Sequence, residues 1–213
     1  SVGLIFTSSL SFSDVKVERI FRPARLVRGN TGICAVQPID TAAWLTHPDI
    51  ATEMGDVPMP RIVHFKCDFT SDGSPLEFDV CGDERYLLKI DGNAVSRGPH
   101  RGTVENWMYQ SYRAELSAGK HVIEAIVWKM PKGASPLAQL SYRHGFCFKA
   151  YGRYDKILTT GKGNWVCGPI TGIKNIGKSG GAWGMGDQFQ MNGNGMFNRC
   201  NDVHLKPAVV RRP

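Results

Sequence analysis

The sequence lacks long apolar runs and several patterns that mark common protein classes. No stretch of its 213 residues approaches the roughly 18 consecutive apolar residues of a membrane-spanning helix. The mildly apolar segment 2–10 has neither a basic flank nor a small-residue cleavage pattern, so no signal peptide is predicted. The His-Glu-x-x-His pattern of zinc proteases is also absent. A hydrophobic content of 42% with 21% charged residues is instead typical of a globular protein that can bury a core.

The cysteines include no Cys-x-x-Cys pair, and metal ligation favours such close spacing. The six residues are Cys34, Cys67, Cys81, Cys147, Cys167 and Cys200. Those at 67, 81 and 147 lie within apolar, strand-like runs, where a free cysteine behaves as a small hydrophobic residue. Reduced thiols are therefore favoured for most of the six, and one disulfide bridge is left open. We predict neither a metal site nor a cofactor.

No group of acidic residues forms a convincing catalytic pair. Glycoside hydrolysis uses two carboxylic acids that flank the sugar. Asp79, Asp83 and Glu84 are close in sequence, but the last two fall in a predicted turn, and Asp91 is required by a turn of its own. The Gly-Lys-Ser sequence at 177–179 follows no apolar strand, so a nucleotide-binding loop is not predicted. We assign no catalytic residue.

Short alternating strands dominate what is present. Alternate positions are apolar in residues 61–69, and residues 121–128 are apolar on both faces apart from Glu124, which predicts a central strand. Asp91-Gly92 separates two strand-like runs, and both residues tolerate the positive φ angles of a tight hairpin turn. We predict an all-β fold, an antiparallel β-sandwich of jelly-roll type. A helical turn is expected only near residues 103–108, and residues 156–160 and 164–167 are expected to form a further hairpin.

Composition divides the chain into three parts. Residues 1–39 are expected to form N-terminal strands or an arm that packs on the sandwich, and residues 40–170 the sandwich itself. Residues 171–213 are predicted to be a long glycine-rich loop region and tail, because 11 of the 24 glycines fall between residues 161 and 195. The chain begins without methionine and ends without a closing element, so we expect a piece of a longer polypeptide.

The formal net charge of +7 has two interpretations. Much of it lies between residues 129 and 163, which hold seven lysines and arginines against Asp155 alone. These cations are spaced singly among strand-like residues, which is typical of a solvated sheet face. The alternative is an independent module that binds an anionic polymer through this basic face. Nucleic acid is not the expected partner.

Aromatic residues in loops give the candidate ligand site. The candidate sugar contacts are Arg97, His100, Arg101, Glu105, Trp107, Tyr109 and Trp183. An aromatic ring can stack on the C–H face of a sugar while nearby polar groups bind its hydroxyls. The competing interpretation is that Trp107 and Tyr109 close the end of the sandwich. The same two interpretations, a sugar contact or a structural role, are open for Trp183.

Three segments together carry a resemblance to a known family. YLLKIDGNAVSRGP, NWMYQSY and LSAGKHVIEAIVW resemble the N-terminal β-sandwich domain of bacterial α-L-rhamnosidase-like glycoside hydrolases, a relative of the galactose-binding jelly roll. The matching residues are Tyr86, Leu88, Ile90, Asp91, Gly92, Gly98, Pro99, Trp107, Tyr109, Tyr112, Leu116, Gly119, Val122 and Ile123. Asp91 and His121 stand where that family often has asparagine. The similarity covers residues 40–170, including AWLTHP at 43–48.

The resemblance implies an accessory, non-catalytic module. In that family a separate helical domain hydrolyses the glycoside, and this sequence has no helical pattern that could form one. The implied role is structural or carbohydrate-binding, and the implied partners are a carbohydrate and the catalytic domain of the same polypeptide. The family also suggests a bacterial periplasmic or extracellular location.

Overall fold

The computed structural model describes most of the sandwich predicted from the sequence. The described residues are 15–22, 25–29, 32–36, 38–55, 57, 60–98, 108–131, 143–171, 173–179, 186–191 and 205–210, with the backbone alone for 25–29, 32–36, 173–179 and 186–191.

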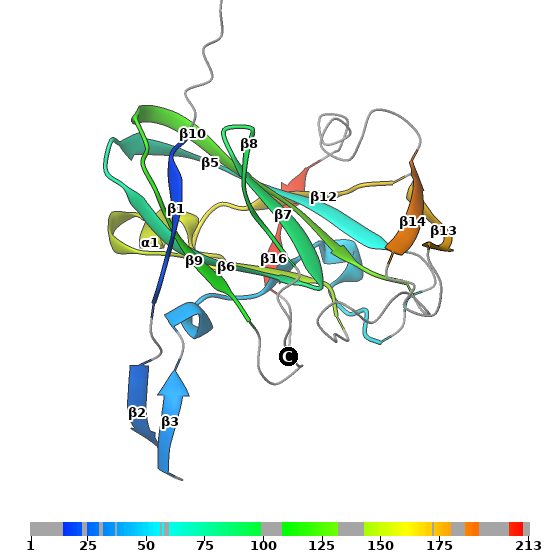
Figure 1. Cartoon of the computed structure of the whole chain (residues 1–213), viewed down its shortest axis with the longest axis horizontal. Helices are drawn as coiled ribbons and strands as arrows, with labels where there is room; N and C mark the ends of the chain where they lie inside the picture. The colour runs from blue at the N-terminus through cyan, green and yellow to red at the C-terminus, as the bar shows by residue number, and fades with distance from the viewer. Residues whose placement is uncertain are drawn as a thin grey trace, which may run out of the picture.

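Two antiparallel sheets of six strands face each other, which confirms the all-β sandwich (Figure 1). The first, here called the β6 sheet, has the order β1 (Val17–Ile20), β9 (Gln110–Ala114), β6 (Leu76–Asp83), β11 (Gly145–Ala150), β4 (Leu45–Thr46) and β16 (Val209–Val210). The second, the β5 sheet, has the order β15 (Lys206–Pro207), β12 (Val166–Pro169), β5 (Arg61–Asp72), β10 (Ala118–Lys129), β7 (Arg85–Ile90) and β8 (Asn93–Arg97).

Aromatic side chains fill the space between the sheets. Phe78 and Phe148 of the β6 sheet stack with ring centroids 4.9 Å apart, and Phe65 of the β5 sheet stacks on Phe146 at 5.2 Å. Trp165 packs edge-on against Phe146 at 5.3 Å. The inward positions of β5 all belong to this core, as the alternation in residues 61–69 predicts. The core therefore fixes which face of each strand turns outward.

The hairpin predicted at Asp91-Gly92 is confirmed. It joins β7 to β8, with φ angles of +49° at Asp91 and +80° at Gly92. Positive φ at both central residues is the geometry of a type I′ turn, whose twist matches the flanking strands. Strand β10 lies between β5 and β7, as its two apolar faces predict.

The strand expected over residues 156–160 is wrong. A 3-10 helix, η3 (Gly152–Tyr154), leads into the short helix α1 (Asp155–Leu158). The side chains of Thr159 and Thr160 then accept hydrogen bonds from the backbone of β11, both at 3.1 Å. Because these hydroxyls bind the sheet, the segment packs on β11 without forming a strand.

The C-terminal part contains strands within the region predicted to be loop. Strands β13 (Ile173–Ser179) and β14 (Gly186–Met191) form a hairpin with an irregularity at Asn175–Gly177, where a glycine suits a bulge. Strands β15 and β16 add to the edges of the two large sheets. The helical turn expected near residues 103–108 lies almost wholly outside the described residues.

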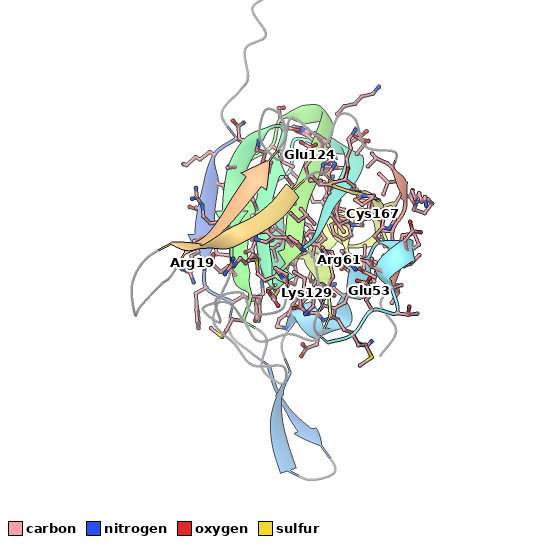
Figure 2. All side chains as sticks on the ribbon, turned by 90° about the vertical axis from the view of Figure 1, so that its right-hand side faces the viewer. Arg19, Glu53, Arg61, Glu124, Lys129 and Cys167 are labelled. Atoms are coloured by element: carbon pink, nitrogen blue, oxygen red, sulfur yellow. The ribbon has the colours of Figure 1, made fainter. Side chains whose placement is uncertain are left out.

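The N-terminal part contributes to the sandwich and to a separate hairpin. Strand β1 pairs with β9. Strands β2 (Arg25–Gly29) and β3 (Gly32–Val36) form a hairpin that stands away from both large sheets (Figure 1 and Figure 2). The 3-10 helix η1 (Pro38–Thr41) returns the chain to the sandwich, where Ile39 packs against Cys81 and Cys147.

Local polar contacts hold the connection that enters β5. The 3-10 helix η2 (Pro48–Ile50) is capped by His47, whose Nδ1 accepts the Asp49 N–H at 3.2 Å. Beyond it, Arg61 donates two hydrogen bonds to Glu53, of 2.6 and 2.8 Å (Figure 2). Among the described helices, none is long and apolar enough to cross a membrane.

The four cysteines whose side chains are described are buried thiols outside any disulfide, in agreement with the expectation of reduced thiols. They are Cys67, Cys81, Cys147 and Cys167. Burial raises the pKa of Cys67 to about 11 and that of Cys167 to about 12. Both thiols are therefore poor nucleophiles in the folded protein.

Candidate functional site

A polar hollow of about 260 Å³ opens between β8 and β9. Its lining residues are Leu87, Ala94, Val95, Ser96, Arg97, Gln110 and Tyr112. The hollow lies between the edge strand of the β5 sheet and a strand of the β6 sheet. Here called the edge hollow, it contains one of the predicted contacts, Arg97.

A chain of hydrogen bonds orders the polar groups of the edge hollow. The hydroxyls of Tyr86 and Ser96 lie 2.8 Å apart, and Ser96 donates to the Tyr112 hydroxyl at 3.1 Å. Tyr112 in turn donates to the side-chain carbonyl oxygen of Gln110. Burial raises the pKa of Tyr86, so its hydroxyl stays protonated and remains a donor. Fixed hydroxyl and amide groups next to the exposed Arg97 guanidinium can bind the hydroxyls of a ligand.

The structure places the two described sugar-contact candidates in different surroundings. Arg97 lines the edge hollow. Tyr109 is half-buried and packs with the cluster of Ile39, Cys81 and Cys147. Burial raises the pKa of Tyr109, as do the nearby carboxylates. The other five candidates, His100, Arg101, Glu105, Trp107 and Trp183, lie outside the described residues.

A larger hollow of about 560 Å³ lies where β5 and β10 extend past the end of β7. Its lining residues are Asp68, Phe69, Thr70, Asp91, Lys120, His121 and Val122. Here called the turn hollow, it lies beside the Asp91-Gly92 turn. It combines apolar surface with two acidic and two basic side chains, which is a composition suited to a polar ligand.

Asp91 and His121 form a tightly bonded pair in the wall of the turn hollow. One Asp91 oxygen lies 2.6 Å from His121 Nδ1, and the other accepts the Val122 N–H at 2.9 Å. His121 Nε2 lies 2.9 Å from the carbonyl oxygen of Ser117. Both ring nitrogens face oxygen acceptors, which is the arrangement that the imidazolium ion satisfies with two donors.

The electrostatics of the pair agree with this geometry. Burial lowers the pKa of His121, but the hydrogen bonds to Asp91 and to the Ser117 carbonyl, together with the Asp91 charge, outweigh it, and the pKa is raised. The imidazole is 6% exposed. Sequence reasoning assigned Asp91 to the turn and placed His121 at the start of a strand, but it did not join them. The signal that could have joined them was the register between β7 and β10, which sets the turn beside residue 122.

Asp79 is fully buried on the outward face of the β6 sheet, beneath Arg22 and Tyr151. Tyr151 donates to one Asp79 oxygen at 2.5 Å, and Arg22 Nε lies 3.4 Å from the other. The guanidinium lies 3.6 Å from the centroid of the Tyr151 ring, a cation–π contact, and pairs with Glu77 at 2.8 Å. These contacts anchor the segment between β1 and β2 and shield the carboxylate from solvent.

The neighbouring acids at the end of β6 are also engaged in structural contacts. Asp83 is 1% exposed. Glu84 accepts the backbone N–H of Met130 at 3.0 Å and lies 3.6 Å from Lys129 Nζ. Burial raises the pKa of Glu84 despite these partners. Glu84 therefore holds the end of β10 beside the turn between β6 and β7, as its structural interpretation predicts.

Two short motifs around Gly177 carry no site. The spacing of Gly172, Gly177, Lys178 and Ser179 fits a phosphate-binding loop, and 177–181 fits the Gly-x-Ser-x-Gly pattern. Both motifs need a turn between a strand and a helix. Here 173–179 is itself strand β13 of a two-stranded hairpin. In the part of the chain that the structure describes, no three His, Cys, Asp or Glu residues form a group that could hold a metal ion.

Comparison with known proteins supports the fold. No family model matches the sequence, and no curated protein matches it. One solved structure matches, the GH78 family rhamnosidase of Bacillus sp. GL1, with a TM-score of 0.52 and 20% sequence identity. The match covers 65% of this chain and 14% of the rhamnosidase chain. At this identity the likeness establishes the sandwich fold.

Proposed function

We propose that the chain is a non-catalytic, carbohydrate-binding module of a rhamnosidase-like glycoside hydrolase. The observation that carries the proposal is the fold match, which covers 65% of this chain but 14% of a GH78 family rhamnosidase. A segment that makes up 14% of the rhamnosidase chain corresponds to one of several modules in that protein. The resemblance of residues 40–170 to the accessory domains of such enzymes agrees with it.

The contacts of the acidic residues support the non-catalytic part. A glycosidase needs two carboxyl groups about 5–10 Å apart around an open sugar site. Asp79 and Glu84 are held by internal partners, and both oxygens of Asp91 are bonded to residues of β10. A carboxylate fixed in this way is not available for proton transfer to a substrate.

The edge hollow is the proposed sugar site. Arg97 and Gln110 line it with polar side chains, and Tyr112 holds the Gln110 amide in place. Residues 99–107 connect β8 to β9 and carry Trp107, whose ring is the proposed stacking surface for a neutral sugar. Binding is expected to be weak, because the hollow is small for a drug-sized or oligosaccharide ligand.

The test measures binding and hydrolysis with the same protein. The chain should bind one or more rhamnose-containing oligosaccharides on an array, and it should release no product from an aryl rhamnoside. Arg97→Ala and Trp107→Ala should each abolish binding, whereas Arg153→Ala on η3 should not. Binding unchanged in both variants would refute the site, and hydrolysis by the wild-type chain would refute the non-catalytic assignment.

The alternative, binding of an anionic polymer through the basic face, has weaker support. Lys129, Lys149, Arg153 and Lys162 each form an ion pair with a carboxylate. Such pairing lowers the positive charge offered to a polymer. A salt series separates the two functions, because polyanion binding weakens steeply with salt through counterion release and binding of a neutral sugar does not.

A further inference from the structure

One cation that lines the turn hollow has no counter-charge in the part of the chain that the structure describes. Asp68 pairs with Lys66 at 3.2 Å, and Asp91 pairs with His121 at 2.6 Å. Lys120 is exposed and has no ion-pair partner among the residues that the structure describes. The lining therefore leaves one positive charge available, at the rim of the hollow.

The rest of the turn hollow combines apolar and polar side chains, as sugar-binding sites do. Phe69 and Val122 contribute apolar wall, and Thr70 contributes a hydroxyl that can donate and accept. The volume of about 560 Å³ falls within the range of roughly 300–1,000 Å³ that small-molecule pockets occupy. The hollow can therefore hold a monosaccharide unit together with an anionic substituent.

The Asp91–His121 pair gives this wall a fixed shape. Both Asp91 oxygens and both His121 nitrogens are occupied by bonds within the protein, so neither residue needs a ligand to satisfy it. The imidazolium charge is balanced by the Asp91 carboxylate. A ligand in the hollow consequently meets Lys120 as its unbalanced charge, with the pair behind it as a rigid support.

We propose that the turn hollow is a second binding site, specific for a uronate, a sugar unit that carries a carboxylate. Lys120 binds the carboxylate of the ligand, and Thr70 and Asp68 bind its hydroxyls. The inference rests on the proposed function in taking the ligand to be a saccharide. It differs from the edge hollow in position and in the charge of the ligand that it selects.

The test compares ligands that differ at one group. Methyl glucuronide, methyl glucoside and sodium acetate are titrated separately into the ¹⁵N-labelled chain, and the amide shifts near residues 68–70 and 120–122 are followed. Methyl glucuronide should bind up to about fivefold more tightly than methyl glucoside, the ratio that an exposed ion pair of about 1 kcal/mol gives, and more tightly than acetate. Lys120→Gln should remove this preference, and the control Lys156→Gln on α1 should retain it.

Each outcome decides the proposal. Equal binding of the glucuronide and the glucoside would overturn the role of Lys120. Equal binding of the glucuronide and acetate would overturn the assignment of a saccharide as the ligand. Absence of shifts near the hollow with all three probes would overturn the site. The two proposed sites are tested by different variants. Arg97→Ala and Trp107→Ala test the binding of neutral sugars in the edge hollow, and neither should alter the binding of glucuronide in the turn hollow.

Discussion

Replacing Asp91 with asparagine should destabilise the protein, and it should do so most at low pH. Asparagine tolerates the positive φ angle of the turn and can still accept the Val122 N–H through its side-chain oxygen. The hairpin should therefore persist. What Asp91→Asn removes is the negative charge opposite the His121 imidazolium.

The expected loss follows from the bonds that change. A hydrogen bond to a charged group contributes about 1.5–3 kcal/mol and a neutral one about 0.5–1.5 kcal/mol, so the free energy of unfolding should fall by about 1–2 kcal/mol. The pKa of His121 is raised in the folded state. The stabilisation is thus fully present below the unfolded pKa, near 6.5, and is lost as pH rises through the folded pKa. The difference between the two proteins should shrink over that range.

Urea unfolding followed by tryptophan fluorescence, at a series of pH values from about 5.5 upward, measures this difference. Asp68→Asn is the matched control: this acid lines the same hollow but is 68% exposed, so its removal should change stability by less than about 0.5 kcal/mol. A deficit for Asp91→Asn that is the same at every pH would mean that His121 is neutral in the folded protein, and the reasoning would fail.

Three further predictions concern the core and the thiols. Phe148→Ala should lower the free energy of unfolding by about 3–5 kcal/mol, because the ring is fully buried, whereas Phe21→Ala, with 89% exposure, should change it little in the same urea titration. Gly163→Ala should cost about 1–3 kcal/mol by the same measurement, because its Cβ would lie 2.3 Å from a backbone carbonyl oxygen. Cys67 and Cys167 should not react with a thiol reagent near neutral pH until the protein unfolds, since burial raises both pKa values; fast modification of either in the native protein would contradict their placement.

The strands and the main turn could be predicted because their causes are local. Alternation in residues 61–69 follows from one face of β5 meeting the core, and residues 121–128 are apolar on both faces because β10 is central. Asp91-Gly92 requires positive φ angles that few other residue pairs adopt. Each feature is determined by residues that are neighbours in the sequence, so the sequence alone predicts it.

The features missed depend on side-chain contacts and on the relative lengths of neighbouring strands. Residues 156–160 resemble a strand, but Asp155 is held by Lys149 and Lys162, and the pKa of its carboxyl is lowered by these hydrogen bonds. Those contacts keep a helical turn against β11. The turn hollow arises because β10 and β5 continue past the end of β7, a mismatch in length that no local pattern records. Thirty residues separate Asp91 from His121.

The positions of Asp91 and His121 are coupled by the same mismatch in strand length. Because β7 ends at Ile90 opposite Ile123, the residue after it must lie beside Val122 and His121. Asparagine at both positions would replace this ion pair with two neutral amides, which can bond to each other. An acid at 91 without a base at 121 would leave a partly buried charge unbalanced, and a base without the acid would do the same. Each residue therefore depends on the other, and the ion pair makes this hairpin sensitive to pH where an amide pair would not be.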